Sequence, residues 1–195
     1  FDRGTEYGCG TSECGPGCKR CSRFIECGNT LTIAGIEIQN LGQENRYYKF
    51  LEKGFYMAED VMGVERILRA SKNLNSDYDV KEMEAVCNDI FEVIPPLAKN
   101  TIPEKDMRQA IEAIAGGVKS LLFLCADGAH EVRGHQKASY IKTTARNILG
   151  QMMALDIKES VYINIIIEEL IKQFVAAYPQ LSHAGQTVYE LLQER

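Results

Sequence analysis

The feature of this sequence that most restricts its fold is a cluster of cysteines near the amino terminus. Five of the seven cysteines lie within residues 9–27, with the spacing C-x4-C-x3-C-x2-C-x5-C. Three glycines and a proline lie between them, and these residues disfavour a regular helix or strand. Such a segment has to be held together by bonds other than the backbone hydrogen bonds of a helix or sheet. The sequence leaves two possibilities, disulfide bonds or a metal ion.

Disulfide bonds are the leading interpretation of the cysteines. They persist in oxidising compartments, so this interpretation predicts a secreted, extracellular protein. The chain begins with Phe1 and not with Met, which is compatible with a removed leader or with a piece of a longer protein. The disulfide candidates are all seven cysteines: Cys9, Cys14, Cys18, Cys21, Cys27, Cys87 and Cys125.

The pairing of these cysteines stays open. Cys87 and Cys125 each fall at or beside the apolar stripe of a separate predicted helix. They could pair with each other, one could pair with the amino-terminal segment, or both could remain reduced core residues that pack as small hydrophobes. Because seven is an odd number, a fully oxidised monomer keeps one free thiol, or two copies share an intermolecular bridge.

A metal site is the alternative, and it predicts an intracellular protein. Cys18-x2-Cys21 is a zinc knuckle that Cys9, Cys14 or Cys27 could complete. Cys14-x3-Cys18-x2-Cys21 also resembles the motif that holds an iron–sulfur cluster in radical SAM enzymes, and this resemblance implies such a cluster as the other possible cofactor. The resemblance covers those three cysteines only. Arg20 stands where that family usually has an aromatic residue, and its alternating strand–helix pattern is absent.

Composition limits the class of partner. The chain has 195 residues, of which 45% are hydrophobic and 25% charged, as in an ordinary globular protein. Its net charge of -5 argues against nucleic acid or an anionic membrane as the main partner. The densest apolar run, residues 161–167, is followed by two glutamates, so no membrane span is predicted.

Residues 30–39 show the period of a β-strand. Leu31 and Ile33 alternate with polar residues, and Ile36 and Ile38 do the same after Ala34-Gly35. This pattern predicts either a short hairpin that turns at Ala34-Gly35 or one kinked strand. We therefore expect residues 1–42 to form a cysteine-rich cap with a short hairpin, and residues 43–195 a helical bundle that makes one compact body with the cap.

From Glu44 onward, helical periodicity dominates. A bent first helix is predicted from an apolar stripe at Tyr47, Leu51, Phe55, Ala58, Met62 and Leu68. Capping-box patterns at 79–82 and 101–104 predict the next two helices. Their core stripes are Met83, Val86, Ile90 and Ile94 in one, and Met107, Ile111, Ile114, Val118, Leu121 and Cys125 in the other.

Three further helices complete the prediction. Ile141, Ala145, Ile148, Met152 and Leu155 mark one helix, residues 161–178 a second that is apolar nearly all round, and residues 184–192 a short last one. Gly116-Gly117 predicts a close approach of another helix or a bend. The predicted fold class is mainly α: a multi-helix bundle with an N-terminal Cys/Gly-rich disulfide-stapled segment and a short β-hairpin.

The sequence contains no convincing catalytic signature. His130 and His135 are five residues apart, which is the wrong spacing for the two zinc ligands of a metalloprotease helix. Gly10-x4-Gly15 lacks the lysine and hydroxyl of a phosphate-binding loop. We assign no catalytic and no cofactor-binding residue, and a protein without catalysis is the favoured interpretation, with an enzyme whose site carries no recognisable motif as the remaining alternative.

The leading functional prediction is a secreted, disulfide-stabilised helical protein that binds or assembles without catalysis. Its predicted partners are a second copy of the chain, another protein, or an apolar small molecule held between helices. The alternative is an intracellular zinc- or iron–sulfur-binding protein that uses Cys9, Cys14, Cys18, Cys21 and Cys27.

Overall fold

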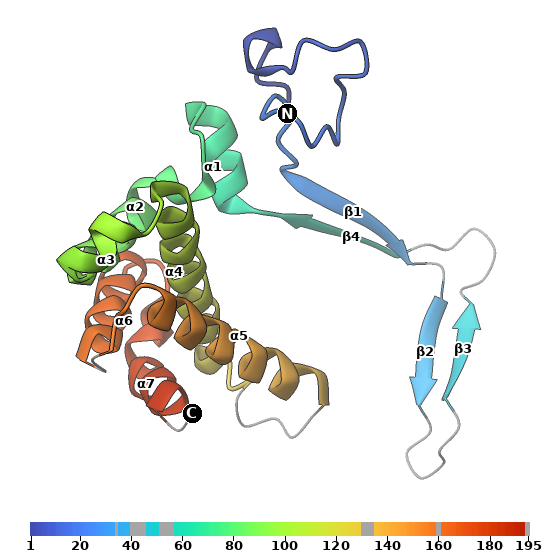
Figure 1. The fold of residues 1–195 in the computed structure, drawn as a ribbon. Coiled ribbons are helices and arrows are strands. Elements are labelled where there is room, and N and C mark those ends of the chain that lie inside the picture. The colour runs from blue at the N-terminus through green and yellow to red at the C-terminus, as the bar shows by residue number, and fades with distance from the viewer. Residues whose placement is uncertain (34, 40–45, 51–56, 130–134, 159–160, 194–195) are drawn as a thin grey trace. The chain divides into compact units, whose positions relative to one another are not determined.

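A computed structural model describes residues 1–33, 35–39, 46–50, 57–129, 135–158 and 161–193 (Figure 1). The chain divides into two compact units, residues 1–77 and residues 78–195. The boundary expected between residues 42 and 43 lies outside the described residues, as do His130 and Glu131. The prediction of a mainly helical protein is confirmed, with seven α-helices in the described part of the chain.

The described part of the first unit contains four short strands and one α-helix. Residues 1–27 form loops, one 3-10 turn, Thr5–Tyr7, and an isolated antiparallel bridge between Asp2 and Phe24. The other elements are β1 (Gly28–Ile33), β2 (Gly35–Gln39), β3 (Arg46–Phe50), β4 (Met57–Met62) and α1 (Val64–Lys72). Strands β1 and β4 pair antiparallel, from Gly28 opposite Met62 to Ile33 opposite Met57. Strands β2 and β3 form a separate antiparallel hairpin (Figure 1).

The predicted hairpin turn at Ala34-Gly35 is wrong. β1 pairs with β4 and β2 pairs with β3, so the two strands on either side of Ala34 do not pair with each other. Alternation along one segment shows that it is extended, but it does not show which other segment it pairs with. The partner of β1 is 24 residues further along the chain than the end of the strand, from Ile33 to Met57.

The predicted helix that starts near Glu44 is also wrong. The structure has β3 and β4 there, and a helix begins only at Val64. The residues Tyr47, Tyr48 and Phe50 are aromatic residues of the kind enriched in strands. Gly63 has an extended backbone and precedes the first residue of α1. The predicted stripe therefore combined residues of two strands and one helix, and its Leu51 and Phe55 lie outside the described residues.

The second unit is a bundle of helices. Its elements are a 3-10 turn, Asp77–Asp79, that begins at the unit boundary, then α2 (Lys81–Val93), α3 (Pro96–Thr101), α4 (Glu104–Ala126), α5 (His135–Ala154), α6 (Val161–Phe174), a 3-10 turn (Pro179–His183) and α7 (Gly185–Gln193). The stripes predicted for α2, α4 and α5 are buried at every position. The short helix α3 was not predicted from the sequence; its first residue is Pro96, a position that proline favours.

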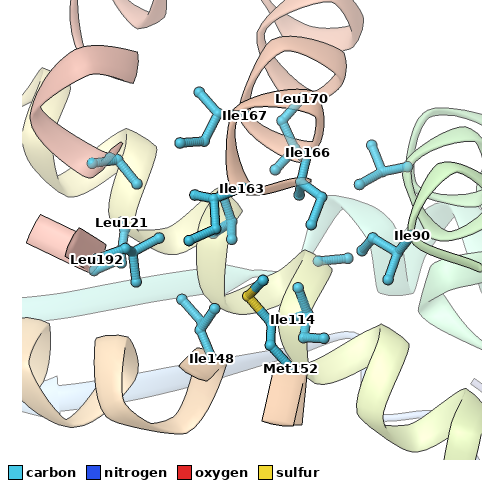
Figure 2. Packing of buried hydrophobic residues seen from close by; sticks show 14 of the residues in the cluster. Ile90, Ile114, Leu121, Ile148, Met152, Ile163, Ile166, Ile167, Leu170 and Leu192 are labelled. Atoms are coloured by element: carbon cyan, nitrogen blue, oxygen red, sulfur yellow. The ribbon is translucent and has the colours of Figure 1, made fainter. Parts of the chain in front are cut away.

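The core of this unit lies around α4, which packs against α2, α5, α6 and α7. Figure 2 shows Ile114 and Leu121 of α4 among side chains from the other four helices. By length and composition α4 could also cross a membrane. Its apolar side chains, however, form the centre of the bundle, with Ile114 and Leu121 completely buried.

Helix α6 is the other main contributor to this core. Ile163, Ile166, Ile167 and Leu170 point into the cluster (Figure 2), whereas Ile165 is 38% exposed. The segment is therefore amphipathic, and it is helical despite its high β-propensity. Its four buried side chains follow the spacing i, i+3, i+4, i+7 of one helix face.

Gly117 allows α5 to approach α4 closely. A β-carbon at this position would lie 2.7 Å from Cγ1 of Ile148, which is buried on α5. At Gly116 a β-carbon would meet the hydroxyl of Tyr78. The close-approach reading of the Gly-Gly pair is confirmed. The side chains of Ile148 and Tyr78 occupy the space beside the two glycines, and the predicted apolar ligand stays a prediction.

The predicted helix starts are confirmed, but their caps differ. The structure has no side-chain cap hydrogen bond at the start of α2 or α4. Asp79 pairs with Arg108 instead, and the Thr101 hydroxyl donates to the carbonyl of Leu97 at 2.9 Å. The capping-box pattern thus predicted where the two helices begin, but not the hydrogen bonds that the side chains of Asp79 and Thr101 make.

We expect Gly117→Ala to lower the free energy of unfolding by about 1 kcal/mol. The new methyl group gains about 1 kcal/mol of helix propensity but overpacks Ile148, which costs about 1–3 kcal/mol. The matched control is Gly150→Ala on α5, where a β-carbon meets nothing within 4 Å. That variant should be more stable by about 0.5–1 kcal/mol. Urea unfolding followed by circular dichroism checks both, and equal effects would contradict the close approach.

Candidate metal centre

The cysteine segment is built from tight turns. The amide of Cys14 donates to the carbonyl of Thr11 at 3.1 Å, and the amide of Cys18 donates to the carbonyl of Gly15 at 3.0 Å. In the second turn, Pro16 stands at the second position and Gly17 at the third with φ of 83°. This is the residue preference of a type II turn, which requires positive φ at its third position. The glycines and the proline therefore fold the chain back so that successive cysteines face one point.

Four of the five clustered thiols meet at that point. The Sγ atoms of Cys9, Cys14, Cys18 and Cys21 all lie within 4.8 Å of one another. The Sγ atoms are 3.6 Å apart in Cys14 and Cys21 and 3.8 Å apart in Cys9 and Cys18. All four residues are half-buried.

These separations fit one metal ion and not disulfide bonds. A disulfide bond is about 2.0 Å long. Four sulfurs bound tetrahedrally at about 2.3 Å from a zinc ion lie about 3.8 Å from one another, because this is the edge of such a tetrahedron. The structure has all seven cysteines as free thiols. The predicted disulfide staple is therefore wrong.

An iron–sulfur cluster fits this geometry less well. In a cluster each thiolate binds its own iron atom, so the four sulfurs stand farther apart than sulfurs that share a single metal ion. Here the two closest pairs are already at the tetrahedral edge length, 3.6 and 3.8 Å. Among the alternatives that the spacing left open, the donor set favours zinc.

The other three cysteines lie outside this centre. The Cys27 thiol is directed at the carbonyl of Ile25, 3.8 Å away. Burial raises the pKa of Cys87 to about 12, with a further contribution from the charge of Glu112, and it raises the pKa of Cys125 to about 11. Both are free thiols, Cys125 within the core and Cys87 half-buried against it, which agrees with the alternative of reduced core residues.

Basic groups surround the four thiols. Arg20 donates to the Thr11 hydroxyl at 3.3 Å and to Glu13 at 3.2 Å, and its pKa is raised chiefly by Cys18. The pKa of Cys9 is lowered to about 6 by hydrogen bonds from Thr11 and, to a smaller extent, from other thiols of the cluster. Four thiolates and one divalent zinc ion carry a net charge of -2, which a guanidinium beside them partly offsets.

Arg3 anchors the cysteine segment to the residues that follow α1. It is 6% exposed, and its guanidinium donates to Asn73 at 2.8 and 3.2 Å, to Asn75 at 3.3 Å and to Ser22 at 3.3 Å. It also stacks on the ring of Tyr7, 3.9 Å from the ring centroid. A buried guanidinium needs such partners, since it remains charged at all ordinary pH values.

Backbone hydrogen bonds join the two ends of the cysteine segment, residues 1–3 and residues 23–25. The amide of Arg3 donates to the carbonyl of Arg23 at 2.8 Å, and the amide of Ile25 donates to the carbonyl of Phe1 at 2.9 Å. Asp2 binds Arg23 through two hydrogen bonds of 2.8 and 2.7 Å. This pairing lowers the pKa of Asp2 to about 2.

Sequence analysis named the four cysteines together with Cys27, but it could not choose between them. It missed Arg3 altogether. The residue carries no motif, and its role depends on Asn73 and Asn75, seventy residues away along the chain. One signal for the partner residue was available in the sequence. Asn73 stands at the start of a polar loop, and asparagine tolerates the left-handed backbone that ends a helix, here with φ of 52°.

A groove between α2 and α4 is a second hollow in the described part of the chain. It has a volume of about 230 Å³. Arg108 and Cys87 are among the residues that line it, and Arg108 binds both Asp79 and Glu112. The arginine of the groove is thus already paired with two carboxylates.

Comparison with known proteins places the chain beside one group of enzymes. It is 28% identical over 196 residues to the alanine–tRNA ligase of Caldicellulosiruptor saccharolyticus, covering 98% of this chain and 20% of that protein. The chain is similar to a segment of alanine–tRNA ligases. The ligase of Clostridioides difficile is 28% identical over 184 residues, covering 93% of this chain and 19% of that protein. No protein-family model matches the chain.

The same similarity extends to a further relative. Alanine–tRNA ligase 1 of Lachnoclostridium phytofermentans is 27% identical over 199 residues, covering 98% of this chain and 20% of that protein. The chain thus spans about a fifth of the length of the curated relatives it matches.

These findings correct the functional prediction. A secreted, disulfide-stabilised binding protein is contradicted by four free thiols that converge on one point and by the similarity to tRNA ligases. The extracellular location was inferred from disulfides alone, and it is wrong for the same reason. The cysteine spacing could not distinguish a metal site from disulfides, because the same spacing suits both. Self-association stays a prediction.

We expect Arg3→Met to weaken the closure of the cysteine segment. The substitution leaves the oxygens of Asn73 and Asn75 without their charged donor, at a cost of about 2–3 kcal/mol. Hydrogen exchange at the amides of Arg3 and Ile25 should then be about 30-fold faster or more, since about 1.4 kcal/mol corresponds to tenfold.

The matched control for Arg3 is Arg66→Met. The side chains of Arg66 and Glu26 are 48% and 63% exposed, so removing this ion pair should change stability little. Comparable acceleration of exchange in the two variants would show that Arg3 is not the anchor.

Proposed function

We propose that this chain is an intracellular zinc-binding protein segment with a tRNA-related role. Cys9, Cys14, Cys18 and Cys21 hold one structural Zn²⁺. The observation that carries the zinc assignment is the convergence of four free Sγ atoms within 4.8 Å. The similarity over nearly the whole chain to alanine–tRNA ligases supports the tRNA-related role.

A four-thiolate site is structural in character. Zinc sites that use four protein ligands leave no position for a water or a substrate, whereas catalytic zinc sites keep one open. When bound, zinc supplies folding energy by joining ligands that are distant along the chain. That contribution suits the first 28 residues, in which Ile25 is the one buried hydrophobic residue.

The electrostatics of the segment are consistent with this role. The pKa of the Arg20 guanidinium is raised chiefly by Cys18. The pKa of the Arg23 guanidinium is raised chiefly by Asp2, and Cys14 adds a smaller contribution. Positive groups beside a thiolate centre favour the deprotonated sulfurs that zinc requires. A reducing, intracellular environment keeps the sulfurs available.

We expect the purified, reduced protein to contain one zinc ion per chain, measured by elemental analysis together with native mass spectrometry. Replacing any one of the four clustered cysteines by serine should weaken zinc binding more than about 100-fold, since even the loss of an outer hydrogen-bond partner costs about 10–100-fold. Competition with a chromophoric chelator measures the affinity.

Cys27→Ser is the matched control for this experiment. It removes a half-buried cysteine of the same segment that lies outside the cluster, so the zinc affinity should be unchanged. Iron in place of zinc, no metal at all, or an equal loss of affinity in Cys27→Ser would refute the assignment.

The tRNA-related part of the proposal needs a separate test. The chain has a net charge of -5, so we expect its contact with RNA phosphates to be weak and sensitive to salt. Selectivity is therefore the informative quantity. In gel-shift titrations at low salt, a tRNA for alanine should be bound at least about threefold more tightly than a tRNA for another amino acid.

The net charge predicts that nucleic acid is not the main partner, so weak binding is the expected result of the gel-shift titrations. Equal binding of both tRNAs, or no binding of either, would contradict the tRNA-related role. The zinc assignment does not depend on this result, because it is measured by metal content alone.

A further inference from the structure

The four clustered sulfurs form two close pairs. Cys9 and Cys18 lie 3.8 Å apart, and Cys14 and Cys21 lie 3.6 Å apart. The pairs interleave along the chain, because Cys14 lies between Cys9 and Cys18, and Cys18 lies between Cys14 and Cys21. The same four atoms that suit a zinc tetrahedron are therefore also arranged as two potential disulfides.

Little movement separates the two arrangements. A disulfide bond is about 2.0 Å long, so each pair has to close by less than about 2 Å. The backbone between the cysteines contains Gly10 and Gly17 at positive φ, and a β-carbon at either would meet nothing within 4 Å. These open glycine turns can adjust without displacing packed side chains.

The sulfurs are also accessible to a small oxidant. The four cysteines are half-buried, and the neighbouring residues Thr11, Pro16 and Lys19 are exposed. Thiolates react with peroxides far faster than thiols do, and zinc ligation keeps the sulfurs deprotonated.

We propose that this zinc centre is a redox switch, in which a hydroperoxide converts the four ligands into Cys9–Cys18 and Cys14–Cys21 disulfides and releases the metal. The proposal rests on the zinc-binding function proposed above. It adds a regulation of the same site, with a defined pairing of the cysteines.

The reaction balances with hydrogen peroxide as the oxidant. One thiolate of a pair attacks the peroxide, the O–O bond breaks, and a sulfenic acid and a hydroxide ion form. The second thiolate of the pair attacks that sulfur, forms the S–S bond and expels a second hydroxide. Each disulfide therefore consumes two thiolates and one peroxide, and the sulfurs lose two electrons that the peroxide oxygens gain. After two such steps no thiolate is left to bind zinc.

The remaining cysteines should not take part. Cys27 faces a backbone carbonyl outside the cluster. In the helical unit Cys125 is buried and Cys87 is half-buried, and burial raises the pKa of each thiol. A thiol with a raised pKa is a poor nucleophile. Oxidation at low peroxide concentration should thus be confined to the four ligands.

The test uses the full chain, first reduced and loaded with zinc. Hydrogen peroxide is added in steps, zinc release is followed with a chromophoric chelator, and the disulfides are mapped by mass spectrometry of peptides. We expect one zinc ion released and two peroxides consumed per chain, with Cys9–Cys18 and Cys14–Cys21 as the products. A dithiol reductant with added zinc should restore the starting state. Cys27→Ser should behave as the parent chain does.

The outcomes separate this inference from the zinc assignment. Zinc bound by the reduced chain but retained through oxidation overturns the switch and leaves the zinc site intact. The switch is also overturned by other pairings, by sulfinic acids in place of disulfides, or by release that depends on Cys27. No zinc in the reduced chain refutes the zinc site itself, and the switch with it.

Discussion

The amino-terminal segment depends on four sulfur atoms that meet at one point. Within residues 1–28 the buried side chains are Ile25 and Arg3, which is far too little apolar surface to hold a fold of loops together. A metal ion joins four points of the chain at once, and the free energy of binding becomes free energy of folding. Arg3 then attaches the assembled segment to the end of α1 through Asn73 and Asn75.

The helical unit is stabilised in a different way. Its core is apolar and centred on α4, with α6 supplying one complete face (Figure 2). Here the decisive detail is the absence of a side chain at Gly117, which lets Ile148 of α5 pack directly against the backbone of α4. The chain thus combines a segment that we propose is held by metal–ligand bonds with a unit held by apolar packing, and each can be tested by substitutions that leave the other unchanged.

Errors in the predicted fold share one physical cause. The apolar residues of 47–68 match a helical period by coincidence, whereas the pairing of β1 with β4 depends on residues far apart in the chain. The disulfide prediction failed similarly. Spacing alone does not say whether two cysteines approach to about 2 Å or share a partner at a tetrahedral distance. The helical stripes of α2, α4 and α5 were predicted correctly because a helix face is defined by residues within a few turns.

The sequence by itself determined the helices α2, α4, α5, α6 and α7 of the second unit, the buried faces of α2, α4 and α5, and the need for something other than packing at residues 9–27. These follow from local periodicity and from residue chemistry, which act over a few positions. Only the tertiary structure decided that Cys9, Cys14, Cys18 and Cys21 converge while Cys27 does not, that β1 pairs with β4, and that Arg3 is buried against Asn73. Each of these depends on the distance between residues that are separate in the chain, and no local pattern encodes that distance.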